Sequence, residues 1–262
     1  MFKFKRLLFS LTFRINITMF VLLGILGWGF AKTASYLLVS ISNAHQCFSM
    51  SSVVTQSIDE HLLRIENSIK ASALTSQTKY LTESNSRTFC DSVRSIVGVD
   101  SVYINIHRDE QPRVEKGLRQ VWETGTSIWT EPHKDNSGNI VVTYLTPLQN
   151  ISGKTYAVLC ADMTLGWLDE LAEKERTTER TVISVRSKDN IFIYHPEKDK
   201  MLHPADSADM AVTEESFYEE PLKKAFWNSN STTTETVSEH TGWRIHCMIP
   251  ARDHNYLSMI IL

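Results

Sequence analysis

The sequence predicts an α+β protein in which an N-terminal membrane helix leads into a long helix that carries two antiparallel-sheet lobes. An apolar run near the N-terminus is followed by an uninterrupted amphipathic pattern with helical spacing. Two groups of strand patterns, each divided by turn residues, come after it. The chain has 262 residues, which suffices for one large or two small domains.

Charge and cysteine content exclude several classes of function. The net charge of −3 argues against a nucleic-acid partner. The four cysteines (Cys47, Cys90, Cys160 and Cys247) include no C-x-x-C pair, so the sequence predicts neither a zinc site nor a redox motif. An oxidising compartment would permit disulfides, but the sequence does not fix their pairing. Cys160 lies in a predicted strand, where a small buried side chain is the expected role.

The N-terminus predicts a membrane anchor. Residues 1–14 are basic and are expected to stay in the cytoplasm, and residues 15–41 are expected to form a membrane helix and its outward extension. A cleaved signal peptide is the alternative, but the Phe30-Ala31-Lys32-Thr33-Ala34 stretch is a poor cleavage site. Gly27, Ala31 and Ser35 form a face of small side chains, which suggests close approach of a second membrane helix and a homodimer.

Residues 42–80 predict a long outer helix. Val54, Ile58, Leu62, Ile65 and Ile69 step by three or four and form an apolar stripe, and no glycine or proline interrupts the pattern. The other face is predicted to carry the polar residues, Glu66 and Lys70 among them. The stripe is expected to pack against the sheets. A coiled coil between two copies is the alternative, and both can hold on different faces.

Residues 81–176 predict the membrane-distal lobe with its connecting helix. A short helix is expected over residues 86–97, strands over 101–107, 140–145 and 155–162, and the connecting helix over 165–176. Residues 108–128 are predicted to be irregular. In the first strand Tyr103, Asn105 and His107 share a polar face, which can line a pocket or simply face solvent.

Residues 177–253 predict the membrane-proximal lobe. Strands are expected over 181–185, 191–195, 232–237 and 243–249, with a helix over 214–228 that Pro221 would start or kink. His107, His195 and His203 have no partner at metal-ligand spacing, so no metal site is predicted. Residues 254–262, apolar from Tyr256 onward, predict the start of a second membrane helix that leads to a cytoplasmic output module. If Leu262 is the natural terminus, a membrane-anchored binding protein without that output is the alternative.

The centre of the chain resembles a double Cache domain, the PAS-like extracytoplasmic sensor of bacterial membrane receptors. Trp129, Glu131 and Pro132 precede a Val-Val-Thr-Tyr strand over residues 141–144, with Pro147 after it. A second strand starts after Gly153, passes through Ala157 and Val158, and ends at Asp162 before the aliphatic Leu165. The resemblance covers roughly residues 43–250. It implies an inner-membrane protein whose residues 42–253 are extracytoplasmic and whose distal lobe binds a small molecule. In that topology Cys47 and Cys247 both lie near the membrane, so the resemblance allows a disulfide between them without establishing it.

The resemblance also nominates ligand-binding residues. In relatives that bind amino acids, an Arg-x-Trp-Tyr element holds the ligand carboxylate and an aspartate at the position of Asp162 holds the ammonium. Asp162, Tyr144 and Trp129 carry over by position, although a helix cap is the alternative for Asp162 and a core role for Trp129. This chain instead has Arg119-Gln120-Val121-Trp122, so Arg119 and Trp122 are nominated by chemistry, and Tyr103 by its strand face.

Two other functions stay open beside a ligand sensor. One is a membrane-anchored enzyme that faces outward. The sequence argues against it, because it contains no G-x-S-x-G motif, no H-E-x-x-H motif and no glycine-rich phosphate loop between a strand and a helix. The other is a protein-binding module whose pocket is degenerate, as the departure at residues 119–122 suggests. No enzyme activity and no cofactor are predicted for this region. Ligands of the amino acid or organic acid class are expected.

Overall fold

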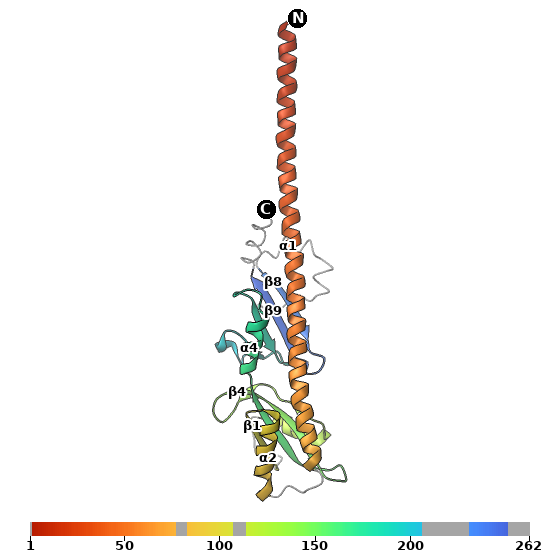
Figure 1. Ribbon diagram of the computed structural model, residues 1–262, viewed down its shortest axis with the longest axis vertical. Helices are drawn as coiled ribbons and strands as arrows, with labels where there is room; N and C mark the ends of the chain where they lie inside the picture. The colour runs from red at the N-terminus through yellow and green to blue at the C-terminus, as the bar shows by residue number, and fades with distance from the viewer. Residues whose placement is uncertain (1, 77–82, 107–113, 206–230, 251–262) are drawn as a thin grey trace.

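A computed structural model describes residues 2–76, 83–106, 114–205 and 231–250. Its largest element is α1 (Phe2–Ser76), a single helix of 75 residues. Figure 1 shows two sheets stacked along the C-terminal half of this helix, while its N-terminal half projects beyond them. The predicted membrane helix and the predicted outer helix are therefore one continuous element.

The two halves of α1 differ in what covers them. The segment Thr12–Ser35 is long and apolar enough to cross a membrane, and none of its most apolar window is buried within the molecule. Its large side chains are exposed, with Phe20 at 81% and Phe30 at 77%. Farther along, the stripe that includes Ile58 and Leu62 is 0% exposed. The first half therefore has an apolar surface suited to lipid, and the second supplies the protein core.

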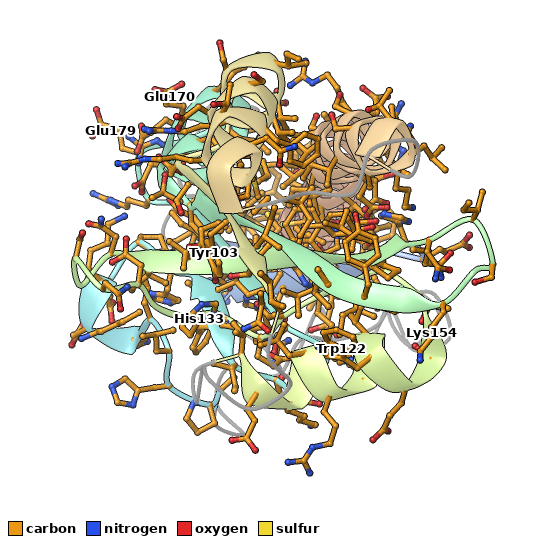
Figure 2. The ribbon with its side chains drawn as sticks, turned by 90° about the horizontal axis from the view of Figure 1, so that it is seen from below. Tyr103, Trp122, His133, Lys154, Glu170 and Glu179 are labelled. Atoms are coloured by element: carbon orange, nitrogen blue, oxygen red, sulfur yellow. The ribbon has the colours of Figure 1, made fainter. Side chains whose placement is uncertain are left out.

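The distal lobe is an antiparallel sheet with strand order β1-β5-β4-β2, in which β3 also pairs with β4. Its strands are β1 (Ser101–Asn105), β2 (Ile128–Trp129), β3 (His133–Lys134), β4 (Ile140–Gln149) and β5 (Thr155–Thr164). Helix α2 (Glu83–Val97) packs beside β1, and α3 (Glu115–Thr124) packs on β4 and β5. Figure 2, seen from the distal end, shows the sheet between α3 on one side and α1 with α2 on the other.

The proximal lobe is a four-stranded antiparallel sheet with strand order β7-β6-β9-β8. Its strands are β6 (Val182–Arg186), β7 (Phe192–Tyr194), β8 (Ser231–Val237) and β9 (Arg244–Pro250). Helix α4 (Gly166–Glu175) links the lobes, and a short 3-10 helix, η1 (Lys198–Lys200), follows β7. Both β8 and β9 contact α1. One continuous core therefore runs from Cys47 to Ala73 along α1 and joins both sheets.

Local chemistry explains the long β4–β5 hairpin. The Asn150 side-chain oxygen accepts hydrogen bonds from the backbone N–H of Ser152 at 3.1 Å and of Lys154 at 2.9 Å. Gly153 takes a φ of 77° in this turn, a left-handed conformation that favours glycine. The turn closes a ladder in which Thr143 pairs with Asp162, so both side chains lie on the same face.

Three sequence expectations need correction. The segment predicted to be irregular contains α3, whose buried Leu118 and Val121 pack on the sheet. Asp162 does not cap a helix, because β5 continues to Thr164 and α4 starts only at Gly166 with no side-chain cap. Glu66 was predicted on the polar face of the long helix, but only 4% of it is exposed.

The remaining helix and strand predictions agree to within a few residues with α2, β1, β4, β5, α4 and the four proximal strands. Several predictions fall outside the residues that the structure describes. These are the helix over residues 214–228, the start of a second membrane helix over 254–262, and the place of His107 on the polar face of the first strand.

Candidate functional site

A buried carboxylate lies on the α3 side of the distal sheet. Because side chains alternate along strands, Ser101 and Tyr103 of β1, Thr143 of β4 and Asp162 of β5 face the same side. Asp162 is 9% exposed. Thr143 donates to its Oδ1 atom at 2.7 Å, and Tyr103 donates to the same atom at 3.4 Å. The other oxygen, Oδ2, has a longer contact, 3.5 Å, with the Ser101 hydroxyl.

The electrostatics of this cluster suit a positively charged ligand. Burial raises the pKa of the Asp162 carboxyl, and the hydrogen bonds from Thr143 and Tyr103 only partly oppose that increase. Burial, together with the nearby Asp162, also raises the pKa of the Tyr103 phenol, so this hydroxyl remains a proton donor. Among the described residues, the Oδ2 atom of this buried carboxylate has one long contact, so it can accept further hydrogen bonds from an ammonium group.

Two further residues extend this polar face. His133 of β3 places its Nε2 atom 3.3 Å from the Thr143 hydroxyl oxygen, which can accept from it while donating to Asp162. Asn105, at the end of β1, is 6% exposed, and its Oδ1 atom has no partner among the described residues. A buried amide oxygen without a partner is costly, so Asn105 adds a second acceptor to the face. Figure 2 labels Tyr103 and His133, two of the residues of this polar face.

The rest of the α3 side is apolar. Val114, Leu118 and Val121 pack on sheet residues that include Leu145 and Cys160. Gly117 allows this close approach, because a Cβ atom there would lie 2.9 Å from Leu145 Cδ1. The helix therefore covers the middle of the sheet, and the polar cluster of Asp162 lies toward the α4 end of β5.

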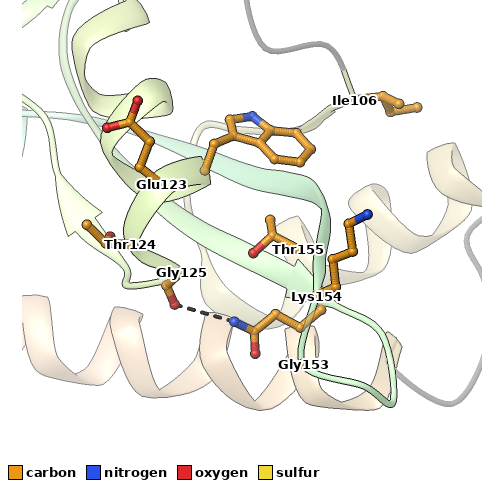
Figure 3. A pocket seen from close by; sticks show the side chains of 9 residues that line it. Ile106, Glu123, Thr124, Gly125, Gly153, Lys154 and Thr155 are labelled. Carbon is orange, nitrogen blue, oxygen red and sulfur yellow. Dashed lines mark hydrogen bonds between the residues drawn. The ribbon is translucent and has the colours of Figure 1, made fainter.

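Arg119 and Trp122 lie on α3 but not at Asp162. Arg119 is exposed and forms an ion pair with Glu115 at 2.8 Å. Trp122 lines an open cavity of about 630 Å³ at the C-terminal end of α3, with Ile106, Lys154 and Thr155. Figure 3 shows the Lys154 ammonium and the Thr155 hydroxyl in this cavity, and the hydrogen bond between Gln149 and the Gly125 carbonyl at its floor. The indole N–H of Trp122 is buried without a partner among the described residues.

Tyr144 and Trp129 lie on the opposite face of the sheet from Asp162. Their rings pack with centroids 4.9 Å apart, and both side chains reach Glu66 of α1. They line a cavity of about 320 Å³ between the lobes, to which the proximal lobe contributes Lys188 and His240. The six nominated residues therefore do not form one site. Asp162 lies with Tyr103, Trp122 lies at the cavity beside the end of α3, Tyr144 lies with Trp129 between the lobes, and Arg119 is on the exposed side of α3.

Glu66 is the centre of the contact between the lobes. Its Oε1 atom accepts from Trp129 Nε1 at 2.7 Å and contacts His240 Nε2 at 2.6 Å. Its Oε2 atom accepts from Lys70 at 3.0 Å and from the Tyr144 hydroxyl at 3.4 Å. Burial by itself would raise the pKa of Glu66, but the hydrogen bonds from Trp129, Lys70 and His240 outweigh it and lower the pKa. A single carboxylate on α1, the spine helix along which both sheets are stacked, thus contacts both lobes.

Sequence reasoning missed Ser101, Thr143 and His133 at the Asp162 cluster and Glu66 between the lobes. Their partners are distant in sequence, so no local pattern joins them. One signal was present for Glu66, which follows Leu62 by four residues and so falls on the apolar stripe. Among the described residues, no group of histidine, cysteine, aspartate and glutamate side chains could hold a metal ion.

Comparison with known proteins points to one structural class. No protein family and no curated protein matches the sequence. Among solved structures, the ligand-binding domain of the Campylobacter jejuni chemoreceptor Tlp3, in complex with 4-methylisoleucine, aligns with a TM-score of 0.61 and 13% identity. That alignment covers 83% of this chain and 94% of the other.

Two further structures agree. The ligand-binding domain of the Pseudomonas aeruginosa PAO1 amino acid chemoreceptor PctC, in complex with GABA, has a TM-score of 0.60 and 14% identity, covering 79% of this chain and 100% of that domain. An extracellular ligand-binding receptor from Desulfohalobium retbaense has a TM-score of 0.55 and 10% identity, covering 78% of this chain. This chain spans 40% of the length of that receptor.

At such identities the likeness establishes the fold. The long helix, the two antiparallel sheets and their order along the chain agree with the double Cache architecture that the sequence predicted. This chain has the fold of the extracytoplasmic ligand-binding domains of bacterial chemoreceptors.

Proposed function

We propose that this chain is the extracytoplasmic sensing region of a membrane receptor and that its distal lobe binds a small molecule through an amino group at Asp162. The observation that carries the proposal is the buried Asp162 carboxylate, whose Oδ2 atom has one contact, at 3.5 Å, among the described residues. The amino-acid complexes of similarly folded domains support this ligand class. Thr143 and Tyr103 hold the carboxylate in place, so an incoming ammonium meets a fixed partner.

The carboxylate side of an amino acid ligand has no assigned partner in this proposal. Arg119 already pairs with Glu115 at 2.8 Å and stands on the exposed side of α3. The proposal therefore commits to an amine, with simple amines and amino acids as its members. It does not require the Arg-x-Trp-Tyr element from which this chain departs.

The exposed apolar segment Thr12–Ser35 supports anchoring of the domain in the cytoplasmic membrane, with the two lobes outside. A ligand that prefers one arrangement of the lobes would shift the population of molecules toward that arrangement. The shift would include α1, because one continuous core joins both sheets to this helix. Association into a homodimer through the face of Gly27, Ala31 and Ser35 stays part of the proposal, as does a cytoplasmic output.

A thermal-shift screen of residues 43–250 against amines, amino acids, organic acids, purines and sugars tests the proposal. A ligand at a hundred times its dissociation constant adds about 2.7 kcal/mol, which raises the melting temperature by roughly 5–10 °C. For the best hit, Asp162→Asn should weaken binding at least about tenfold, because a charge-assisted hydrogen bond contributes about 1.5–3 kcal/mol.

Glu115→Gln is the matched control, since it removes a carboxylate from exposed α3 and should leave affinity unchanged. Binding of an amine with equal affinity by Asp162→Asn would disprove the site. A folded fragment that binds nothing in the library would favour a protein-binding module instead.

A further inference from the structure

Two cysteines that are distant in sequence meet in the proximal half of the molecule. Cys47 lies on α1, and Cys247 lies on β9, 200 residues later. Both are 0% exposed, and their Sγ atoms are 3.8 Å apart. The other two cysteines are elsewhere: Cys90 lies on α2, and Cys160 lies on the α3 face of the distal sheet. The structure therefore selects one pairing that the sequence left open.

The environment of the two sulfurs assigns them no other role. Both belong to the apolar core between α1 and the proximal sheet. Besides each other, the sulfurs have one weak polar contact within the described part of the chain, between Cys47 Sγ and the Thr232 carbonyl oxygen at 3.7 Å. No metal-binding group of side chains occurs among the described residues. Cys247 is paired on both sides, with Ile183 of β6 and Thr234 of β8, so its backbone is held firmly while its side chain faces α1.

The geometry is close to that of a disulfide. A sulfur–sulfur bond is about 2.05 Å long, so the two atoms need to approach by roughly 1.8 Å, a movement on the scale of a side-chain rotation. We propose that Cys47 and Cys247 form an intrachain disulfide that joins the spine helix to the last proximal strand. This rests on the proposed extracytoplasmic location, where disulfides form and persist.

The disulfide between Cys47 and Cys247 would form by thiol–disulfide exchange. The two thiols lose two protons and two electrons, and the oxidant is the disulfide of a periplasmic thiol oxidase or a small-molecule disulfide, which is reduced to two thiols. The contact with Cys47, and after it burial, raise the pKa of the Cys247 thiol in the folded protein. Because the thiolate is the reactive form, exchange has to occur during folding, before α1 closes over the sheet.

The position of this disulfide gives it a mechanical role. Cys47 follows the end of the apolar segment at Ser35 by 12 residues, which corresponds to about 18 Å of helix. Cys247 comes shortly before the end of β9 at Pro250. The bond would therefore fix the membrane-side end of the proximal lobe to α1, so that a rearrangement in the distal lobe moves both as one body.

Counting free thiols in the full chain tests the proposal. The protein is produced in bacterial membranes, quenched with acid, unfolded, and treated with a maleimide–polyethylene glycol before or after reduction. Two of the four cysteines should react without reduction and four after it. Cys47→Ser should give three in both cases because it leaves Cys247 unpaired. Cys160→Ala, the matched buried control, should give one reactive thiol without reduction and three after it.

Protease added to spheroplasts reports independently whether the domain lies outside the cytoplasm. Four reactive thiols without reduction in a domain that protease can reach would overturn the disulfide while leaving the sensor proposal intact. A domain protected from protease would overturn the location and the disulfide with it. A band with the mass of two chains on a non-reducing gel, absent from Cys47→Ser, would show an intermolecular disulfide and would overturn the intrachain one.

Discussion

Replacing Glu66 with glutamine tests whether one buried carboxylate holds the two lobes together. The side chain is 5% exposed and has contacts with four hydrogen-bonding groups, on Lys70, Trp129, Tyr144 and His240. Glutamine keeps the shape but removes the charge, and it turns one acceptor oxygen into a donor amide. Whichever way the glutamine amide points, its NH2 group would face hydrogen-bond donors and could not accept from them.

The cost can be estimated from these partners. A hydrogen bond to a charged group contributes about 1.5–3 kcal/mol, and a buried donor left unpaired costs about 1–3 kcal/mol. Lys70 is 48% exposed and can turn to water, so its share is small. Relief of the desolvation cost of Glu66 offsets part of the rest. We expect Glu66→Gln to lower the free energy of unfolding by about 2–3 kcal/mol, or the melting temperature by roughly 4–12 °C.

Urea unfolding of residues 43–250 measures this change. Glu60→Gln is the matched control, since Glu60 lies on the exposed side of the same helix, where its contact is with Gln56. That control should change stability by less than about 0.5 kcal/mol. Equal effects of the two substitutions would refute the reasoning, because Glu66 would then behave as a surface residue.

The same comparison has a predicted pH dependence. The folded pKa of Glu66 is lowered, so its stabilising effect is complete above the unfolded value of about 4.3 and is lost as the pH falls through the folded pKa. The difference in stability between wild type and Glu66→Gln should therefore be full at pH 7 and shrink below about pH 4. A difference that stays constant down to pH 3 would show that the charge of Glu66 contributes nothing.

Three other substitutions test the packing and the site. Ile58→Asp buries an unpaired charge at a 0% exposed position and should abolish cooperative thermal unfolding, whereas Val53→Asp, at 42% exposed, should change the melting temperature little. Gly117→Ala brings a Cβ atom to 2.9 Å from Leu145 Cδ1 and should lower stability by about 1 kcal/mol in urea, despite a gain in helix propensity; a more stable variant would contradict the packing. Because burial raises the pKa of Asp162, affinity for an amine measured by calorimetry should fall as acid protonates this carboxyl, and an amine that binds better in acid would argue against the contact.

Much of the architecture follows from local patterns. The stripe from Val54 to Ile69 repeats every three or four residues, and burial of this stripe is confirmed. The strand-like runs over residues 140–145 and 155–162 and the turn residues between them predicted the distal hairpin, which β4 and β5 form. The α3 helix was missed because its ten residues carry only two fully buried side chains, too short a pattern to stand out among polar neighbours.

The site was less accessible to sequence reasoning. Asp162 and Tyr103 were nominated by different arguments, and the structure brings them together at 3.4 Å. Tyr144 and Trp129 were nominated beside Asp162, but they point to the opposite face. Neighbouring positions in a strand face opposite sides, so the register between strands decides which residues meet.

The sequence by itself therefore determined most of the helices and strands, their order along the chain and the long apolar helix near the N-terminus, because these depend on neighbours within a few residues. Only the tertiary structure decided that Cys47 meets Cys247, that Glu66 meets His240, and that Asp162 is separated from Tyr144. Each of these relations joins residues through the pairing of strands and their packing on a helix, and that geometry exists only after the chain has folded.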